Sequence, residues 1–363
     1  GGLQGLQEER GELHGRPDLT RQPEADDYGR HDGHQEHAVA GSRITHGLAR
    51  VCHEELRLVG LSPTGDLADH GNPVSLLSPE GCRLGARQPQ ESTSMTDHAS
   101  RIPLVFAHAN GFPGHSYRSF LAPLAEHFDV HPLDRLGHHP DFPVGHNWLA
   151  LRDELLEHLA RFPEPVVGVG HSMGGVLMAM AAEHSPDYFR CVVMLDPPLM
   201  LGLDAQFMKL AKRLGLADRV TPAGRSLGRR DSWPDRQAMV HYLRRRGLFR
   251  RFTEAALHDY VDGGTRELDD GSVVLLYDPD IEVQIFRHLP DHLGELPGRV
   301  RVPLGVLAGD ESELLTRRRR RRLTQRGVSL VGVPGGHMFP MEYPDQARSA
   351  LLAMLDGLLE RPA

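Results

Sequence analysis

The sequence predicts an α/β protein in which helices cover both faces of a mostly parallel sheet. Two observations carry this prediction. From residue 102 onward, short apolar runs alternate with segments of helical spacing, and the runs are apolar at successive positions. Strands that are apolar on both faces must be covered on both sides, which is typical of a parallel sheet between two helical layers. With 363 residues, the chain is long enough for one large domain or two ordinary ones.

The first part of this alternation runs from residue 102 to residue 195. Uninterrupted apolar runs predict the strands, and apolar residues three and four positions apart predict the helices, as with Leu151, Leu155 and Leu159. In chain order we expect a strand at 102–107, a helix at 116–127, a strand at 128–133, a helix at 148–160, a strand at 165–170, a helix at 173–184 and a strand at 191–195.

The pattern breaks after residue 195 and resumes near residue 302. Strands are expected at 302–308 and 328–333, with a helix through the arginine run 317–322 between them and a closing helix at 345–359. The interrupting segment, 197–299, is helical in parts and rich in Arg, Gly and Asp. A segment of about a hundred residues is too long for a simple loop. We therefore expect a largely helical cap inserted before the penultimate strand, although an ordinary surface excursion is the alternative.

Residues 1–94 differ from the rest of the chain. They contain no Phe, Trp or Met, and their apolar residues keep neither a helical nor a strand period. Such a segment buries too little apolar surface to offset the entropy of ordering it. We expect it to be disordered, either as translated sequence upstream of a natural start at Met95 or as a genuine flexible extension. Residues 95–363 would then form the folded domain.

Composition and charge exclude several classes of function. The formal net charge of −8 argues against a dedicated nucleic-acid binder. No run of about 18 apolar residues is present, so we expect no membrane-spanning helix and no membrane partner, and the first residues lack the pattern of a secretory signal. Three cysteines are too few for a disulfide framework and too widely spaced for a zinc motif. We expect a cytoplasmic protein.

The strongest motif is the pentapeptide Gly170-His171-Ser172-Met173-Gly174, which matches G-x-S-x-G. It lies between a predicted buried strand and a predicted helix. A serine at such a sharp turn is held in a strained conformation, and glycines two positions to either side prevent collisions. The turn lifts the serine hydroxyl above the strand ends, and the positive end of the helix dipole favours an oxyanion there. The alternative is that this segment is only a glycine-rich tight turn and that its serine has no catalytic role.

On these residues, the chain from about residue 102 to its end resembles the α/β-hydrolase superfamily, in particular its bacterial serine esterases and thioesterases. The segment HANGF at 108–112 resembles the oxyanion loop of that superfamily, which reads HAGG in type II thioesterases. The resemblance implies that the backbone N–H groups of Asn110 and Met173 hold the oxyanion.

The resemblance also places the catalytic base after the last strand. The segment PGGHM at 334–338 occupies that place, so His337 is expected to be the base. His171, inside the pentapeptide, is expected to be a packing or hydrogen-bonding neighbour.

The acid of the triad has more than one candidate. The superfamily pattern G-x-x-D follows the penultimate strand, but the matching stretch here reads GDES, with Ser312 at the expected position. Some thioesterase domains and haloalkane dehalogenases carry their acid at the end of the strand after the nucleophile, where this chain has Asp196. We favour Asp196, with Asp310 as the alternative and Glu311 and Glu313 as further candidates.

Taken together, these residues imply a serine hydrolase of carboxylic esters or thioesters that works through an acyl-enzyme on Ser172. We expect a small acyl substrate, no metal and no organic cofactor. A serine at this position argues against epoxide hydrolases and haloalkane dehalogenases, which use aspartate there. Two alternatives stay open: a carbon–carbon-bond hydrolase of the same fold, and a non-catalytic ligand-binding or interaction protein. The arginine run 317–322 is expected to be mostly solvated, with some side chains pairing with Glu311 or Glu313.

Overall fold

A computed structural model describes residues 101–360 of the chain. The predictions made for residues 1–94, including the interpretation of Met95, lie outside the described residues. Among the residues that are described, none of the helices has both the length and the apolar character needed to cross a membrane.

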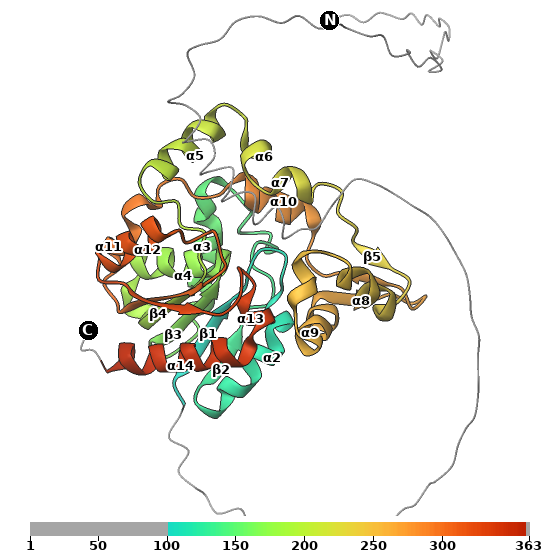
Figure 1. The fold of residues 1–363 in the computed structure, drawn as a ribbon, viewed down its shortest axis with the longest axis horizontal. Helices are drawn as coiled ribbons and strands as arrows, with labels where there is room; N and C mark the ends of the chain where they lie inside the picture. Colours follow the sequence, from blue (N-terminus) through green and yellow to red (C-terminus); the bar gives the residue numbers. More distant parts are fainter. Residues whose placement is uncertain (1–100, 361–363) are drawn as a thin grey trace, which may run out of the picture. The chain divides into compact units, whose positions relative to one another are not determined.

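The core of the structure is a six-stranded sheet in the order β2-β1-β3-β4-β8-β9, and every neighbouring pair is parallel (Figure 1). Every residue of β1, β3 and β8 is buried. This confirms the class predicted from runs that are apolar on both faces. The strands are β1 (Pro103–Ala107), β2 (Asp129–Pro132), β3 (Val166–His171), β4 (Phe189–Leu195), β8 (Leu304–Gly309) and β9 (Ser329–Val333).

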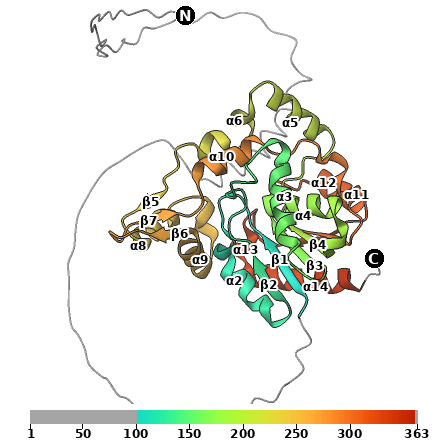
Figure 2. The ribbon, with the colours of Figure 1, turned by 180° about the vertical axis from the view of Figure 1, so that it is seen from behind.

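Helices cover the two faces of this sheet, and each face has its own apolar cluster. Leu104 and Phe106 of β1 point into one cluster, whereas Val105 and Ala107 point into the other, as the two-residue period of a strand requires. On the first face lie α2 (Arg118–Leu121) and α14 (Pro344–Leu359), and on the second lie α3 (Leu149–Leu159), α4 (Met173–His184) and α12 (Arg317–Thr324) (Figure 2).

The helix expected over 116–127 is broken into three short segments. A 3-10 turn (Gly114–Tyr117) leads into α2, and a second 3-10 segment (Ala122–Glu126) follows. Pro123 lies at the start of that second segment. Because proline has no N–H to continue the α-helical hydrogen bonds, the helix cannot run through this position.

The helix α12 shows that half of the arginine run is turned inward. Arg319 is buried and pairs with Asp204, while Arg320 and Arg322 donate hydrogen bonds to backbone carbonyls. The remaining three arginines are exposed, as expected. The prediction of a mostly solvated run was therefore wrong for Arg319, Arg320 and Arg322. Glu311 pairs with Arg251 instead of with the run.

The segment between β4 and β8 forms the expected insertion. It is largely helical, and it also contains a three-stranded antiparallel sheet in the order β5-β7-β6 that the sequence did not predict. Strands of two or three residues are too short to show a period. The elements are α5 (Leu203–Arg213), α6 (Ala217–Val220), α7 (Ala223–Ser226), β5 (Ser232–Trp233), α8 (Arg236–Arg244), a 3-10 segment (Leu248–Arg251), α9 (Glu254–Gly264), β6 (Thr265–Glu267), β7 (Val273–Leu275), α10 (Pro279–Arg287), a 3-10 segment (Leu293–Glu295) and α11 (Leu296–Arg299).

The turn that follows β2 is held by two buried side chains. The N–H of Leu136 donates to Nε2 of His108 at 2.8 Å, and the N–H of Gly137 donates to Oε2 of Glu154 at 2.8 Å. Burial lowers the pKa of His108 to about 4 and raises the pKa of Glu154 to about 7. Both side chains are therefore favoured in their neutral forms inside the protein.

We expect Glu154→Gln to weaken the pH dependence of stability. Between the ordinary carboxyl pKa of 4.5 and about 7, the folded protein keeps a proton that the unfolded chain has lost. Stability therefore falls as pH rises through this window, by about 3 kcal/mol in total. Glutamine keeps an acceptor for Gly137 and removes the ionisation. Urea denaturation at about pH 5 and pH 8 should show a smaller loss in the variant than in the wild type.

The control for this experiment is Glu126→Gln, an exposed substitution at the end of the 3-10 segment that follows α2. It should keep the pH dependence of the wild type. An unchanged pH dependence in Glu154→Gln would contradict the assignment.

Candidate active site

Ser172 lies at the sharp turn between β3 and α4, with a φ of 52° and a ψ of −116°. A positive φ is strained for a residue with a side chain. The turn also brings backbones into close approach. A Cβ at Gly174 would lie 2.1 Å from the carbonyl oxygen of Ala107, and a Cβ at Gly170 would lie 2.3 Å from Gly174. Both glycines of the motif are therefore required by the packing of this turn.

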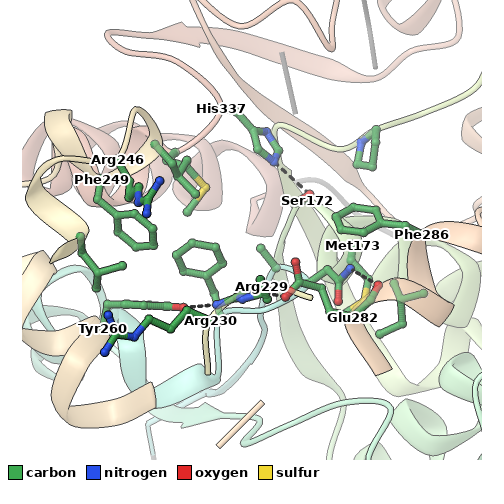
Figure 3. Close-up of a pocket in the computed structure, with 18 of the residues that line it drawn as sticks. Ser172, Met173, Arg229, Arg230, Arg246, Phe249, Tyr260, Glu282, Phe286 and His337 are labelled. Atoms are coloured by element: carbon green, nitrogen blue, oxygen red, sulfur yellow. Dashed lines mark hydrogen bonds and ion pairs between the residues drawn. The ribbon is translucent and has the colours of Figure 1, made fainter. Parts of the chain in front are cut away.

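Three of the residues singled out in the sequence lie together at the ends of the strands. Nε2 of His337 is 3.0 Å from Oγ of Ser172, and Nδ1 of His337 is 2.8 Å from Oδ2 of Asp196. All three are buried. A carboxylate only accepts hydrogen bonds, so Nδ1 carries the proton and Nε2 accepts from the serine hydroxyl. Figure 3 shows His337 directed at Ser172.

Asp196 directly follows the last residue of β4 and has a φ of 43°. Its carboxylate is fully buried and receives two further hydrogen bonds. Ser312 donates from Oγ at 2.5 Å, and the N–H of Gly309 donates at 3.3 Å. The serine that occupies the expected place of the acid is therefore a donor to the aspartate on the neighbouring strand.

Asp310 and Glu311 lie elsewhere. The side chain of Asp310 is 59% exposed and lies 3.6 Å from the guanidinium of Arg320. Glu311 bonds to the guanidinium of Arg251. The structure thus brings Asp196, and neither of these two acids, to His337.

Asn110 and Met173 line the same cavity as Ser172. Their neighbours Ala109 and Gly174 donate their N–H groups within the protein. Among residues 101–360, the N–H groups of Asn110 and Met173 donate to no protein group. Met173 is the first residue of α4, where the unpaired N–H groups and the helix dipole favour negative charge.

A chain of buried hydrogen bonds joins the loop after β1, residues 108–112, to the loop that carries His337. Nε2 of His171 donates to the carbonyl of His337 at 2.9 Å, so Nδ1 accepts from the hydroxyl of Tyr117 at 2.7 Å. The same hydroxyl accepts from the N–H of Ala109 at 3.3 Å. Burial lowers the pKa of His171 well below its ordinary value, which favours the neutral ring.

Sequence reasoning treated Tyr117 only as an apolar residue of a helix. A fully buried tyrosine needs a hydrogen-bond partner for its hydroxyl, and this requirement could have indicated that Tyr117 has polar contacts.

Glu342 supports the His337 loop from the other side. Its carboxylate accepts from the N–H of Gly336 at 2.9 Å and lies 3.2 Å from Arg251. Burial raises the pKa of Glu342. Nothing in the sequence pattern distinguished this glutamate.

A cavity opens above Ser172 and His337, with walls from the cap as well as from the sheet. It is lined by Ala109, Asn110, Phe112, Trp148, Ser172, Met173, Pro198, Arg229, Arg230, Trp233, Tyr242, Leu243, Arg246, Leu248, Phe249, Tyr260, Glu282, Ile285, Phe286, Leu289, His337 and Met338 (Figure 3). The cap therefore covers the serine, and most of the side chains around the cavity are apolar.

A buried ion pair lies in the wall of this cavity. The guanidinium of Arg229 bonds to the carboxylate of Glu282 and donates to the hydroxyl of Tyr260 at 3.1 Å. Ser226 donates to the second oxygen of Glu282 at 3.0 Å. Burial opposes the charge of Arg229, but the neighbouring Glu282 and Tyr260 raise its pKa above the ordinary value. The charge of Arg229 is thus compensated inside the cap.

The same cluster contacts the loop at residues 108–112. The side-chain amide of Asn110 donates to the backbone carbonyl of Glu282 at 3.0 Å, and Tyr260 donates to the carbonyl of Gly111 at 3.5 Å. These hydrogen bonds join the cap to the loop that follows β1.

The model of the Alpha/beta hydrolase family matches residues 104–350. This match spans more than half of the chain, so the protein belongs to the α/β hydrolase family.

Among curated proteins, the chain is similar to the type I acyl-CoA thioesterase mpaH of Penicillium roqueforti, with 26% identity over 160 residues. That match covers 39% of this chain and only 35% of the fungal protein.

Solved structures show the same fold. E-2-(acetamidomethylene)succinate hydrolase aligns with a TM-score of 0.57 and 22% identity, over 71% of this chain and 92% of that one. The thioesterase domain from the curacin biosynthetic pathway aligns with a TM-score of 0.54 and 19% identity, over 69% and 91%. The peroxisomal alpha-beta-hydrolase Lpx1 of Saccharomyces cerevisiae aligns with a TM-score of 0.55 and 16% identity, over 73% and 79%.

We expect Tyr117→Phe to lower the free energy of unfolding by about 1–3 kcal/mol, because it leaves the N–H of Ala109 and Nδ1 of His171 buried without their partner. Urea denaturation measures the difference. The control is Tyr188→Phe, a partly buried tyrosine near the start of β4, which should change stability by less than about 0.5 kcal/mol. Equal effects of the two substitutions would contradict a role for the Tyr117 hydroxyl.

Proposed function

We propose that the protein is a serine hydrolase of carboxylic esters or thioesters, with Ser172 as nucleophile, His337 as base and Asp196 as acid. One observation carries the proposal: an unbroken line of hydrogen bonds from the Ser172 hydroxyl through His337 to Asp196, beside a largely apolar cavity. The similarity to an acyl-CoA thioesterase and to a thioesterase domain supports the acyl class of substrate.

In the first half of the reaction, Oγ of Ser172 attacks the carbonyl carbon of the substrate while Nε2 of His337 takes the hydroxyl proton. Asp196 stabilises the imidazolium and holds the ring in the tautomer that accepts this proton. The carbonyl oxygen becomes an oxyanion, which the N–H groups of Asn110 and Met173 bind. Each such donor contributes on the order of 3 kcal/mol to lowering the barrier.

The oxyanion then collapses and expels the alcohol or thiol, which takes the proton from His337. This leaves the acyl group on Ser172. A water molecule attacks that ester while His337 takes one of its protons. Collapse of the second oxyanion releases the carboxylic acid, and Oγ of Ser172 takes the proton back from His337. No proton or electron is left over at the end of the cycle.

The alternative of a non-catalytic protein is disfavoured by the same geometry. Strained backbone at Ser172 and Asp196 costs about 1–3 kcal/mol at each position. A binding protein would have no use for a serine lifted into this conformation and aligned with a buried histidine.

The test is hydrolysis of p-nitrophenyl esters and acyl thioesters of graded chain length. We expect Ser172→Ala to lower kcat by about three or more orders of magnitude, because the nucleophile is removed. The matched control is Ser349→Ala, an exposed serine on α14, which should keep wild-type turnover. A folded wild-type protein that hydrolyses none of the substrates, or a Ser172→Ala variant that hydrolyses them as fast as the wild type, would contradict the proposal.

A further inference from the structure

We propose that Ser312 is a positioning residue for the reaction, whose hydroxyl keeps the carboxylate of Asp196 ionised and aligned with His337 while the proton moves. The inference rests on the hydrolase function proposed above and adds a residue to the same site. It concerns the position after β8 at which a serine stands where an acid was expected from the sequence.

The carboxylate of Asp196 depends on donors inside the protein, because the residue is fully buried. Burying a charged group is costly unless hydrogen bonds replace those that it made to water. Among residues 101–360, Oδ1 accepts from the N–H of Gly309, and Oδ2 accepts both from Nδ1 of His337 and from the hydroxyl of Ser312. The charge of Asp196 is thus stabilised by very few groups.

Ser312 makes the shortest of these hydrogen bonds. Its Oγ lies 2.5 Å from Oδ2 of Asp196, whereas the nitrogen of Gly309 lies 3.3 Å from Oδ1. A hydroxyl that donates to an ionised carboxylate forms a short hydrogen bond, which is about twice as strong as one between neutral groups. Apart from His337, the serine is therefore the main donor to this carboxylate.

The side chain of Ser312 is itself held in place. Ser312 is buried, and its N–H donates to the carbonyl of Gly309 at 3.0 Å. Its Oγ accepts from the N–H of Leu314 at 3.2 Å. Because this N–H occupies a lone pair of the hydroxyl oxygen, the hydroxyl proton is free to point at Asp196. The donor is therefore aimed at the carboxylate before any substrate binds.

Ser312 acts on the reaction through Asp196 and His337. It does not line the cavity above Ser172. Its hydroxyl donates to the same carboxylate oxygen that accepts from Nδ1 of His337. Loss of the hydroxyl would therefore change the charge and orientation of the group behind the imidazole and leave the walls of the cavity intact. This predicts a lower kcat with little change in KM.

The same hydrogen bond should influence the pH at which the site becomes active. Only the state with an ionised Asp196 and a neutral His337 can take the proton of the serine nucleophile. A donor to the carboxylate favours this state over the states in which the pair has gained a proton. Removal of the Ser312 hydroxyl should therefore move the acidic limb of the pH profile of kcat/KM to higher pH.

Ionisable groups on three neighbouring elements also lie near the pair. The ring centre of His171, the last residue of β3, is 5.0 Å from that of His337, and Arg320 of α12 donates to the carbonyl of Gly309. Glu342, the last residue of α13 (Phe339–Glu342), supports the His337 loop. Substitutions at residue 312 leave all three groups in the protein, so a displaced limb reports on the serine hydroxyl.

The test compares three variants on p-nitrophenyl esters between about pH 5 and about pH 9. Ser312→Ala removes the hydroxyl, and Ser312→Thr keeps one at the same position. Ser116→Ala is the matched control, because Ser116 is also a buried serine, but its hydroxyl has no hydrogen-bond partner among residues 101–360.

We expect Ser312→Ala to lower kcat by about ten- to a hundredfold, as for the loss of a hydrogen bond to a charged group, and to keep KM within about twofold. Its acidic limb should move up by about half a pH unit or more. Ser312→Thr and Ser116→Ala should keep the limb of the wild type. A wild-type kcat or an unmoved limb in Ser312→Ala would overturn the inference, and so would an equal displacement in either of the other two variants.

Failure of the hydrolase proposal would look different. If no substrate is turned over, the pH titration of His337 decides the inference, followed by NMR of protein labelled with ¹⁵N-histidine. The chain has 23 histidines, so the resonances of His337 are identified by their loss in His337→Gln. A higher titration midpoint in Ser312→Ala than in the wild type, with no change in Ser116→Ala, would support the positioning role. An equal or lower midpoint in Ser312→Ala would overturn it.

Discussion

The site depends on one buried imidazole that is held between a hydroxyl and a carboxylate. His337 comes from the loop after β9, Ser172 follows β3 and Asp196 follows β4, so the three meet only because parallel strands end at the same edge of a sheet. Both Ser172 and Asp196 have positive φ angles. Strain at two adjacent strand ends persists only where the surrounding structure fixes it, and here the close glycine contacts of the turn and the buried strands supply that support.

The sheet and the cap meet at the loop that follows β1, residues 108–112. On the side of the sheet, the N–H of Ala109 is fixed by Tyr117, which also orients His171 beneath His337. On the side of the cap, the backbone carbonyl of Glu282 accepts a hydrogen bond from the side chain of Asn110, and the hydroxyl of Tyr260 donates one to the carbonyl of Gly111. Phe112 packs against the aromatic rings of the cap, with its centre 4.8 Å from that of Tyr260. A change in the cap would therefore be transmitted to the groups that surround Ser172.

Much of this arrangement could be predicted from the sequence because it depends on local patterns. Apolar runs predicted the strands, and G-x-S-x-G between a strand and a helix predicted the turn at Ser172. Contacts between residues that are distant in the sequence were harder to predict. The hydrogen bond from Ser312 to Asp196, for example, joins the ends of two strands that are separated in the sequence by the whole cap. The inward position of Arg319 on α12 was missed because its partner, Asp204, lies in the cap, far away in the sequence. The break in the helix before β2 could have been predicted from Pro123. The apolar spacing alone predicted one continuous helix.

The most direct test of the central claim is the turnover of Asp196→Asn beside that of Asp310→Asn. Asparagine keeps the size of the side chain but removes the charge that stabilises the imidazolium, so Asp196→Asn should lower kcat by about 10³–10⁴-fold while circular dichroism shows a folded protein. Asp310→Asn, which changes an exposed carboxylate, should leave kcat within about twofold. A large loss in Asp310→Asn, or equal and mild losses in both variants, would contradict the account of Ser172, His337 and Asp196 as one catalytic unit.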